Sequence, residues 1–180
     1  MPASRRLSQR ISEGDGIAII VCVDDAEGAR AAEADGAKAV AVRAPVEGIR
    51  DATTLPLLWI GDGTPGDADA VCVRPDAEVQ VDGVEAVVDV RDEEELEEAL
   101  EQLDPEIFLL SAIGSDDDED PLDAVLELLP DVPAGKLAIA QVDVSTREEV
   151  LALERAGIDA VLVAAGGELA RLVGHRPLEV

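Results

Sequence analysis

Arginine and aspartate residues stand at the ends of several short apolar runs in this chain. Arg43, Arg74 and Arg91 each close a run rich in Val and Ala, and Asp89 lies two residues before Arg91. Because alternate residues of a strand point to the same side, Asp89 and Arg91 are predicted to share a face. Three more aspartates end or follow other runs: Asp24, Asp62 and Asp143.

These residue types allow two kinds of arrangement. Guanidinium groups bind carboxylates and phosphates through paired hydrogen bonds, so the three arginines predict a site for a small anionic ligand. The aspartates allow a second interpretation, in which acids and arginines neutralise one another in a lid of ion pairs. Four carboxylates suffice to neutralise the arginines, and we therefore favour the lid.

The chain has no set of residues suited to metal or nucleophilic chemistry. Cys22 and Cys72 lie inside apolar runs and are interpreted as buried small hydrophobic residues. A single histidine, His175, and the lack of a Cys-x-x-Cys spacing exclude a zinc site. The acidic run at 115–120 lacks the glycine and distal glutamate of a calcium-binding loop, so it is interpreted as a solvated helix cap. We expect neither metal nor cofactor.

The charge balance restricts the partners. The chain carries 41 acidic and 14 basic side chains, and its net charge of −27 disfavours binding to nucleic acid or to anionic membranes. No apolar run is long enough to span a membrane, and the basic N-terminus has no apolar segment behind it, so we expect a cytoplasmic protein. An acid-rich, Lys-poor surface is typical of a high-salt cytoplasm, and a GC-rich thermophile genome would produce much the same bias.

Short runs of Val, Ile, Leu and Ala recur along the chain and predict strands. They do not alternate with polar residues, which is typical of parallel strands covered on both faces. Eight strands are predicted: Ile17–Val23, Lys38–Arg43, Pro56–Ile60, Asp69–Arg74, Val84–Val90, Glu106–Ser111, Leu137–Val142 and Asp159–Val163. Four helices are predicted: Asp24–Asp35, Asp92–Leu103, Pro121–Leu129 and Ser145–Ala156.

The last of these helices has a predicted capping box, formed by Ser145 and by Glu148 three residues later. The connections after the second, third and fourth strands are too short for ordinary crossover helices. The fold class that fits is α/β, a minimal (βα)₈ TIM barrel with eight short parallel strands and these three helices reduced or missing. Residues 17–180 form this single domain, and residues 1–16 are a short N-terminal remnant.

Missing helices have a consequence for the surface. The outer face of strands two to four is expected to be partly exposed, and an exposed apolar patch usually marks an interface. We therefore predict a homo-oligomer that associates through this helix-poor side. The side chains concerned are Val40, Val42, Leu57, Trp59, and Val71 or Val73.

Two segments of the chain resemble a known family. Val84–Leu100 (VEAVVDVRDEEELEEAL) and Ser145–Val163 (STREEVLALERAGIDAVLV) each join an apolar run to an acid-capped helix. Both resemble units of the indole-3-glycerol phosphate synthase family. The resemblance implies a TIM barrel and a tryptophan-pathway lyase, which closes an indole ring on a phosphorylated substrate with Lys and Glu side chains at the strand ends.

The chain departs from the positions that the resemblance assigns to this chemistry. The family's Lys, Glu, Asn and Glu on strands three, five, six and seven correspond to Ile60, Asp89, Ser111 and Gln141. The two lysines, Lys38 and Lys136, precede strands and are predicted to lie at the opposite end of the barrel.

The phosphate-binding positions also differ. Asp143 places a carboxylate where the family binds phosphate, whereas Gly166 and Gly167 either form an anion-binding nest or begin a helix. The resemblance thus predicts a barrel that has lost the lyase activity, with a small anion as its candidate ligand. One alternative is an active lyase or isomerase on a phosphorylated sugar, with Asp89 and Asp143 as acid and base and the arginines as an anion clamp. The other is a structural or interaction protein.

Overall fold

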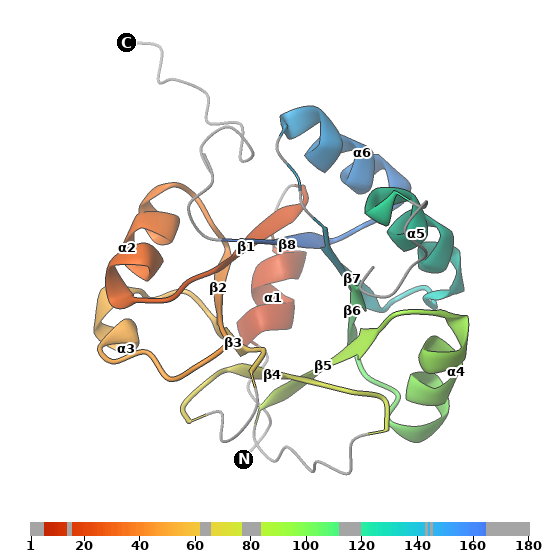
Figure 1. Cartoon of the computed structure of the whole chain (residues 1–180), viewed down its shortest axis with the longest axis horizontal. Helices are drawn as coiled ribbons and strands as arrows, with labels where there is room; N and C mark the ends of the chain where they lie inside the picture. The colour runs from red at the N-terminus through yellow and green to blue at the C-terminus, as the bar shows by residue number, and fades with distance from the viewer. Residues whose placement is uncertain are drawn as a thin grey trace.

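The computed structural model describes residues 6–13, 16–61, 66–76, 84–111, 120–142, 144 and 146–164. Eight parallel strands form a closed barrel in sequence order, with β8 paired to β1, and the helices lie outside it (Figure 1). All eight predicted strands are confirmed. They are β1 (Ala18–Cys22), β2 (Ala39–Val42), β3 (Leu57–Trp59), β4 (Ala70–Val73), β5 (Glu85–Val90), β6 (Ile107–Ser111), β7 (Leu137–Gln141) and β8 (Ala160–Ala164).

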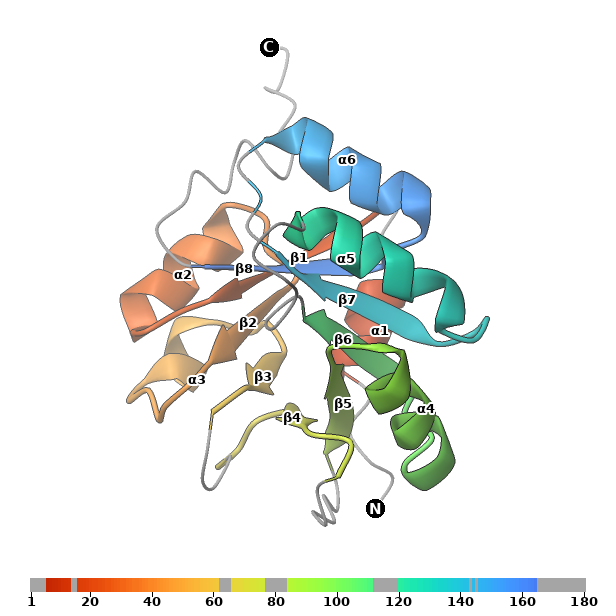
Figure 2. The ribbon, with the colours of Figure 1, turned by 45° about the vertical axis from the view of Figure 1, so that its right-hand side comes forward.

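Helices cover the barrel unevenly, and Figure 2 shows α4, α5 and α6 stacked along one side of it. The only helix between β2 and β3 is the single turn α3, and none is found among the described residues between β3 and β5. This confirms the prediction that three crossover helices are reduced or missing. The outer helices are α2 (Ala26–Ala34), α3 (Ile49–Ala52), α4 (Glu93–Gln102), α5 (Pro121–Leu128, continued by the 3₁₀ turn η1, Leu129–Asp131) and α6 (Arg147–Ala156).

Side chains that accept backbone N–H bonds fix where the longer helices begin. Asp25 caps α2, Asp92 caps α4 and Asp120 caps α5. The capping box of α6 is formed by Thr146 and Glu149, so the prediction of Ser145 and Glu148 is wrong by one residue. Both pairs satisfy the same spacing, and the sequence pattern by itself does not choose between them.

A helix that the sequence did not reveal closes the amino end of the barrel. In α1 (Arg6–Ser12), Leu7 and Ile11 are buried and belong to the same apolar cluster as the inward side chains of the strands. The backbone N–H groups of Leu7 and Ser8 donate to Oε1 of Glu85, at 2.8 and 3.1 Å. Glu85 begins β5, so its carboxylate holds the first turn of α1 against the barrel floor, where the helix dipole favours negative charge. Figure 1 shows α1 within the ring of strands.

The core has two parts. Inward side chains such as Ile20, Leu58 and Ile139 fill the barrel and meet α1, whereas outward ones such as Phe108 pack with the helices in a second cluster. Both faces of each strand are therefore buried, which explains why the strands show no alternation with polar residues. No helix within the described ranges is long and apolar enough to span a membrane.

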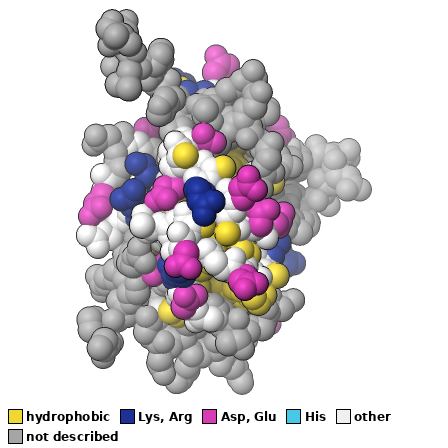
Figure 3. Space-filling model, turned by 90° about the vertical axis from the view of Figure 1, so that its left-hand side faces the viewer, with side chains coloured by type: hydrophobic (Ala, Val, Ile, Leu, Met, Phe, Trp, Pro, Cys, Tyr) yellow, Lys and Arg dark blue, Asp and Glu magenta, His cyan; other side chains and the backbone are white. Residues whose placement is uncertain are grey.

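The outer face of strands two to four is not exposed, and this prediction was wrong. Val40, Val42, Leu57, Trp59 and Val71 are all at most 6% exposed, and Val73 is intermediate. The same cluster contains Ile49 and Ala52 of α3, together with Leu55 and Ala68 from the connections, so short segments supply the cover that long helices would give. Figure 3, which faces α2 and α3, shows apolar side chains only in small areas between charged ones. The prediction of self-association through this side loses the exposed surface on which it was based.

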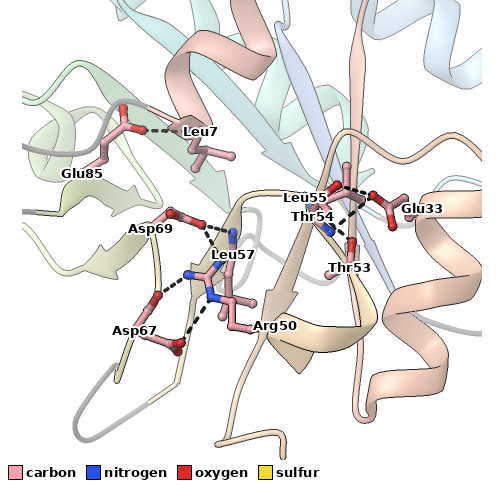
Figure 4. A network of polar contacts seen from close by, with 10 residues as sticks. All are labelled: Leu7, Glu33, Arg50, Thr53, Thr54, Leu55, Leu57, Asp67, Asp69 and Glu85. Atoms are coloured by element: carbon pink, nitrogen blue, oxygen red, sulfur yellow. Dashed lines mark hydrogen bonds and ion pairs between the residues drawn. The ribbon is translucent and has the colours of Figure 1, made fainter. Parts of the chain in front are cut away.

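A polar network holds the helix-poor side together, and Figure 4 shows it. Asp69 is buried, and its Oδ2 accepts from the backbone N–H of Leu57 and from Nη1 of Arg50, both at 2.9 Å. Arg50 also contacts Asp67, with Nε 3.4 Å from Oδ2. Near it, Glu33 of α2 accepts from the hydroxyl and the backbone N–H of Thr54. These contacts join α2, α3, β3 and β4 where no crossover helix does so.

Replacing Asp69 by Ala is therefore expected to destabilise the barrel. The change leaves the buried N–H of Leu57 and Nη1 of the half-buried Arg50 without their acceptor, at a cost of about 2–3 kcal/mol in the free energy of unfolding. Urea denaturation measures the loss. Asp67→Ala is the matched control, because Asp67 is 76% exposed, and we expect it to cost no more than ~0.5 kcal/mol. Equal losses in the two variants would contradict the prediction.

Candidate functional site at the barrel mouth

The carboxyl ends of the strands meet at one end of the barrel, here called the mouth. In TIM barrels this end carries the functional residues. Cys22, Ile60 and Cys72 pack against the inner cluster, so they point toward the barrel axis. Asp89 lies two residues after the inward Val87, and therefore shares its face. Ser111 is buried at the end of β6, and Gln141 is half-buried at the end of β7.

Arg74 is clamped between β5 and α4. Its Nη1 lies 3.3 Å from Oδ2 of Asp89 and donates to the backbone carbonyl of Asp89 at 3.2 Å. Its Nη2 donates to Oε1 of Glu95. The other oxygen of Glu95 accepts from the backbone N–H of Arg91 at 2.7 Å, and Asp92 accepts from the N–H of Glu95 at 2.9 Å. Both terminal nitrogens of Arg74 thus donate to protein acceptors, which agrees with the interpretation of this residue as part of an ion-pair lid.

Asp89 is a half-buried carboxylate on the inward face of β5, at the mouth. Its side chain is 17% exposed. Its Oδ1 is buried, and no hydrogen-bond partner is found for it within the described residues. Burial raises the pKa of Asp89 above its ordinary value, and the guanidinium of Arg74 offsets only part of this rise. Asp89 therefore sits as a poorly solvated carboxylate whose charge is balanced mainly by Arg74.

Arg43 and Arg91 differ from Arg74 because both are exposed. The positive charge of Arg43 works against the rise that burial causes in the pKa of Cys22. Among the described residues, neither Arg43 nor Arg91 has an ion pair at salt-bridge distance. The structure therefore brings only Arg74 into the predicted lid with Asp89, and leaves the charges of Arg43 and Arg91 facing solvent.

Gly61 allows the backbone at the mouth to pack closely. A Cβ placed on Gly61 would lie 1.9 Å from the carbonyl oxygen of Arg43, which is closer than any real contact. The chain after β3 thus approaches the chain after β2 through a position that only glycine fits without a shift of the backbone.

The two cysteines are part of the mouth, which sequence reasoning missed. They were interpreted as buried small hydrophobic residues, but both are only half-buried and both face inward. Burial and the nearby Asp89 raise the pKa of Cys72 to about 12, so its thiol stays protonated at neutral pH. A signal was present in the sequence: Cys22 precedes Asp24 by two residues and Cys72 precedes Arg74 by two, which places each pair on one face.

The lysines lie at the other end of the barrel, as predicted. Lys38 immediately precedes β2 and Lys136 immediately precedes β7, and Nζ of Lys136 is 2.9 Å from Oδ1 of Asp104. These are the only lysines in the chain. Neither lysine therefore supplies an amine to the mouth as a proton donor.

Several predicted residues lie outside the described part of the chain: Asp62, Asp143, Gly166, Gly167 and His175, with residues 115–119 of the acidic run. Within the described part, no group of three or more His, Cys, Asp or Glu side chains could hold a metal ion.

A closed barrel of eight parallel strands with outer helices defines the (βα)₈ TIM-barrel class. For part of the chain, comparison with known proteins finds a relative within this class. An indole-3-glycerol phosphate synthase of Variovorax paradoxus (strain S110) is 37% identical over 81 residues, which are 45% of this chain and 30% of that enzyme. The sequence is thus distantly homologous to that enzyme, and it spans less than a third of the enzyme's length.

A solved structure matches most of this chain. The N-acetylmannosamine-6-phosphate 2-epimerase of Clostridium perfringens superimposes with a TM-score of 0.64, over 87% of this chain and 89% of that chain. The sequence identity is 17%, so this likeness shows the fold alone. No protein-family model matches the chain.

Proposed function

We propose that this protein is an indole-3-glycerol phosphate synthase-like barrel that does not catalyse the lyase reaction. The distant homology and the TIM-barrel fold support the first part of the proposal. The placement of the lysines supports the second, because both stand at the amino ends of strands, away from the mouth. Loss of a positioned general acid typically costs a factor of about 10²–10⁴ in rate.

The residues that replace the family's polar groups point the same way. Ile60 puts an apolar side chain where the lyase needs an amine, and Gln141 cannot take up a proton as a glutamate does. Asp89 keeps a carboxylate, but Arg74 already balances its charge at 3.3 Å. The guanidinium thus occupies a carboxylate oxygen that a substrate would have to reach.

The test is a turnover and binding assay with the family's substrate, carboxyphenylamino-deoxyribulose phosphate, in which indole fluorescence reports product. We expect no turnover above that of the buffer. Turnover that disappears in an Asp89→Asn variant would overturn the proposal, and would favour the alternative of an active lyase with Asp89 as its acid or base.

Binding of a small anion at the mouth is a second candidate function, supported by the exposure of Arg43 and Arg91. Calorimetric titration of the same substrate and of inorganic phosphate tests it. Anion binding that is weakened in an Arg43→Leu variant would support a ligand site. Absence of binding would favour a purely structural or interaction role for a barrel without the lyase activity.

A further inference from the structure

A cleft of about 440 Å³ opens at the amino end of the barrel, beside the end of α1, the end of α6 and the start of β8. Its apolar wall includes Ile17 and Leu137, which are both half-buried. Two carboxylates also line it, Glu154 of α6 and Asp159, which immediately precedes β8. Its volume falls within the range of about 300–1,000 Å³ that small-molecule sites occupy.

Asp159 has the same place beside β8 that Asp69 has beside β4. Asp69 immediately precedes its strand, donates its N–H to the carbonyl of Leu57 and accepts the N–H of Leu57 at Oδ2, both at 2.9 Å. Asp159 makes the same two bonds with Ala138, at 3.0 and 2.9 Å. The register of the two strand pairs is also the same at these residues. The two aspartates are therefore equivalent positions of the barrel.

The two positions differ in their cations. Oδ2 of Asp69 also accepts from Nη1 of Arg50 at 2.9 Å, and Nε of Arg50 lies 3.4 Å from a second carboxylate, that of Asp67. The cleft likewise offers a second carboxylate, Glu154, but no basic side chain within the described ranges lies at ion-pair distance from it or from Asp159. The cleft thus has the two acids of the equivalent position without the guanidinium between them.

The surroundings of the two carboxylates favour a cation. Both side chains are half-buried. Burial raises the pKa of Asp159 above its ordinary value, and the hydrogen bond from Ala138 offsets part of this rise. A Cβ placed on Gly16 would lie 3.1 Å from Oε1 of Glu154, so this carboxylate reaches from α6 to the chain that leads into β1. A cation that enters the cleft offsets the cost of removing these charges from water, and the net charge of −27 attracts it.

We propose that this cleft binds an alkylguanidinium ion. The guanidinium donates to the carboxylates of Asp159 and Glu154, as Arg50 does at the equivalent position, because its planar set of N–H donors suits paired carboxylates. The alkyl chain packs on the apolar wall. The site is independent of the mouth and of the function proposed for it, since no residue belongs to both.

The test is a titration of the ¹⁵N-labelled full chain with n-butylguanidinium chloride at constant ionic strength, followed by amide chemical shifts. We expect saturable shifts that are largest at residues lining the cleft, such as Ser12, Gly16, Gly157 and Asp159. n-Butylurea has nearly the same shape without the charge, and should cause no shifts at the same concentrations. Shifts that spread over the acidic surface, or equal shifts with n-butylurea, would overturn the proposal.

Variants of the two carboxylates locate the binding. Asp159→Asn should weaken it by about tenfold or more, because the charge is lost while the amide oxygen can still accept from Ala138. If this variant fails to fold, as its amide spectrum would show, Glu154→Gln takes its place and should weaken binding as well. The matched control is Glu148→Gln, which removes the same charge from an exposed position of α6, outside the cleft, and should leave the affinity unchanged. An equal loss in the Glu148 variant would reduce the effect to non-specific ion attraction and overturn the proposal.

A guanidinium can come from a free small molecule or from an arginine side chain of another chain. N-acetyl-arginine N-methylamide, titrated in the same way, distinguishes these sources. Binding as tight as that of n-butylguanidinium would support an arginine side chain as the occupant. Much weaker binding would support a free alkylguanidine, since the peptide groups would then not fit the cleft.

Discussion

Salt is expected to stabilise this protein strongly. With 41 acidic and 14 basic side chains, most carboxylates have no cation to pair with, and the folded state concentrates a net charge of −27 on its surface. Repulsion between these charges opposes folding, and salt screens it, since the Debye length falls from about 10 Å at ~0.1 M to about 3 Å at ~1 M. Salt also weakens the attractive pairs, but these are far fewer than the repulsive ones, so the net effect is stabilising.

The expected size is a rise in Tm of about 10 °C or more between ~0.05 and ~2 M KCl, or roughly 3–5 kcal/mol at the ~2–4 °C per kcal/mol of a chain this long. Thermal unfolding followed by circular dichroism measures it. Sucrose at equal osmolality is the control for solvent exclusion, which stabilises proteins without screening.

A variant with fewer acidic side chains tests whether repulsion between carboxylates causes the rise in Tm with salt. Three glutamates are exposed on α4: Glu94, Glu97 and Glu101. Changing all three to Gln reduces the net negative charge without altering the core. The variant should be more stable than the wild type at low salt and should gain less from added KCl. A Tm that does not depend on salt, or a variant with the same salt dependence as the wild type, would contradict the prediction.

The strands and their order could be predicted because their short apolar runs fit neither a buried helix nor a loop. A run such as IIVCV is too short for a buried helix and too apolar for a loop, and acidic helix caps such as Asp92 follow several of the runs. The helix α1 could not be predicted in the same way. It has only seven residues, and two apolar side chains, Leu7 and Ile11, are too few to form a recognisable helical pattern. They are buried only because the folded barrel has an open amino end that they fill.

The burial of the helix-poor side also depends on tertiary structure. Nothing in the sequence near Trp59 shows that Ile49, Ala52, Leu55 and Ala68, from separate connections, join it in one buried apolar cluster. An exposed face was therefore the natural prediction from missing helices, and it failed because short segments can cover short strands.

At the mouth, the period of two predicted that Asp89 and Arg91 share a face. Asp89 lies on the inward face of β5 with Val87, whereas Arg91 follows the end of that strand and is exposed. Sequence reasoning could not tell which arginine would find an acceptor, because that depends on the distance between strand ends. Arg74 follows β4 and meets Asp89 on the neighbouring β5, whereas Arg43 follows β2, whose neighbours β1 and β3 end in Cys22 and Trp59.

Replacing Arg74 by Leu is expected to destabilise the protein at neutral pH far more than in acid. The change leaves the inward carboxylate of Asp89 without its cation, and also removes a partner of Glu95. Arg74 is 35% exposed, so solvent replaces part of what is lost, and we expect a loss of about 1–3 kcal/mol in the free energy of unfolding near pH ~7.

The sign of the pH dependence follows from the pKa of Asp89, which burial raises in the folded state. A carboxyl whose folded pKa exceeds its unfolded pKa favours folding while protonated, and that contribution is lost as the pH rises through the folded pKa. Without Arg74 the folded pKa rises further, so the gap between variant and wild type should widen from pH ~4 to pH ~7. Urea denaturation at both pH values measures the gap.

Two further variants test whether the unpaired charge of Asp89 causes the loss of stability in Arg74→Leu and its pH dependence. The double variant Arg74→Leu/Asp89→Asn removes the stranded charge, and should recover stability relative to Arg74→Leu at neutral pH and lose most of the extra pH dependence. Arg91→Leu makes the same change in net charge at an exposed position two residues from Asp89, and should cost much less. If Arg91→Leu were as costly as Arg74→Leu, or if the gap were the same at both pH values, the mouth would not be held by the Arg74–Asp89 pair. Arg74 would then be as available to an anionic ligand as its neighbours.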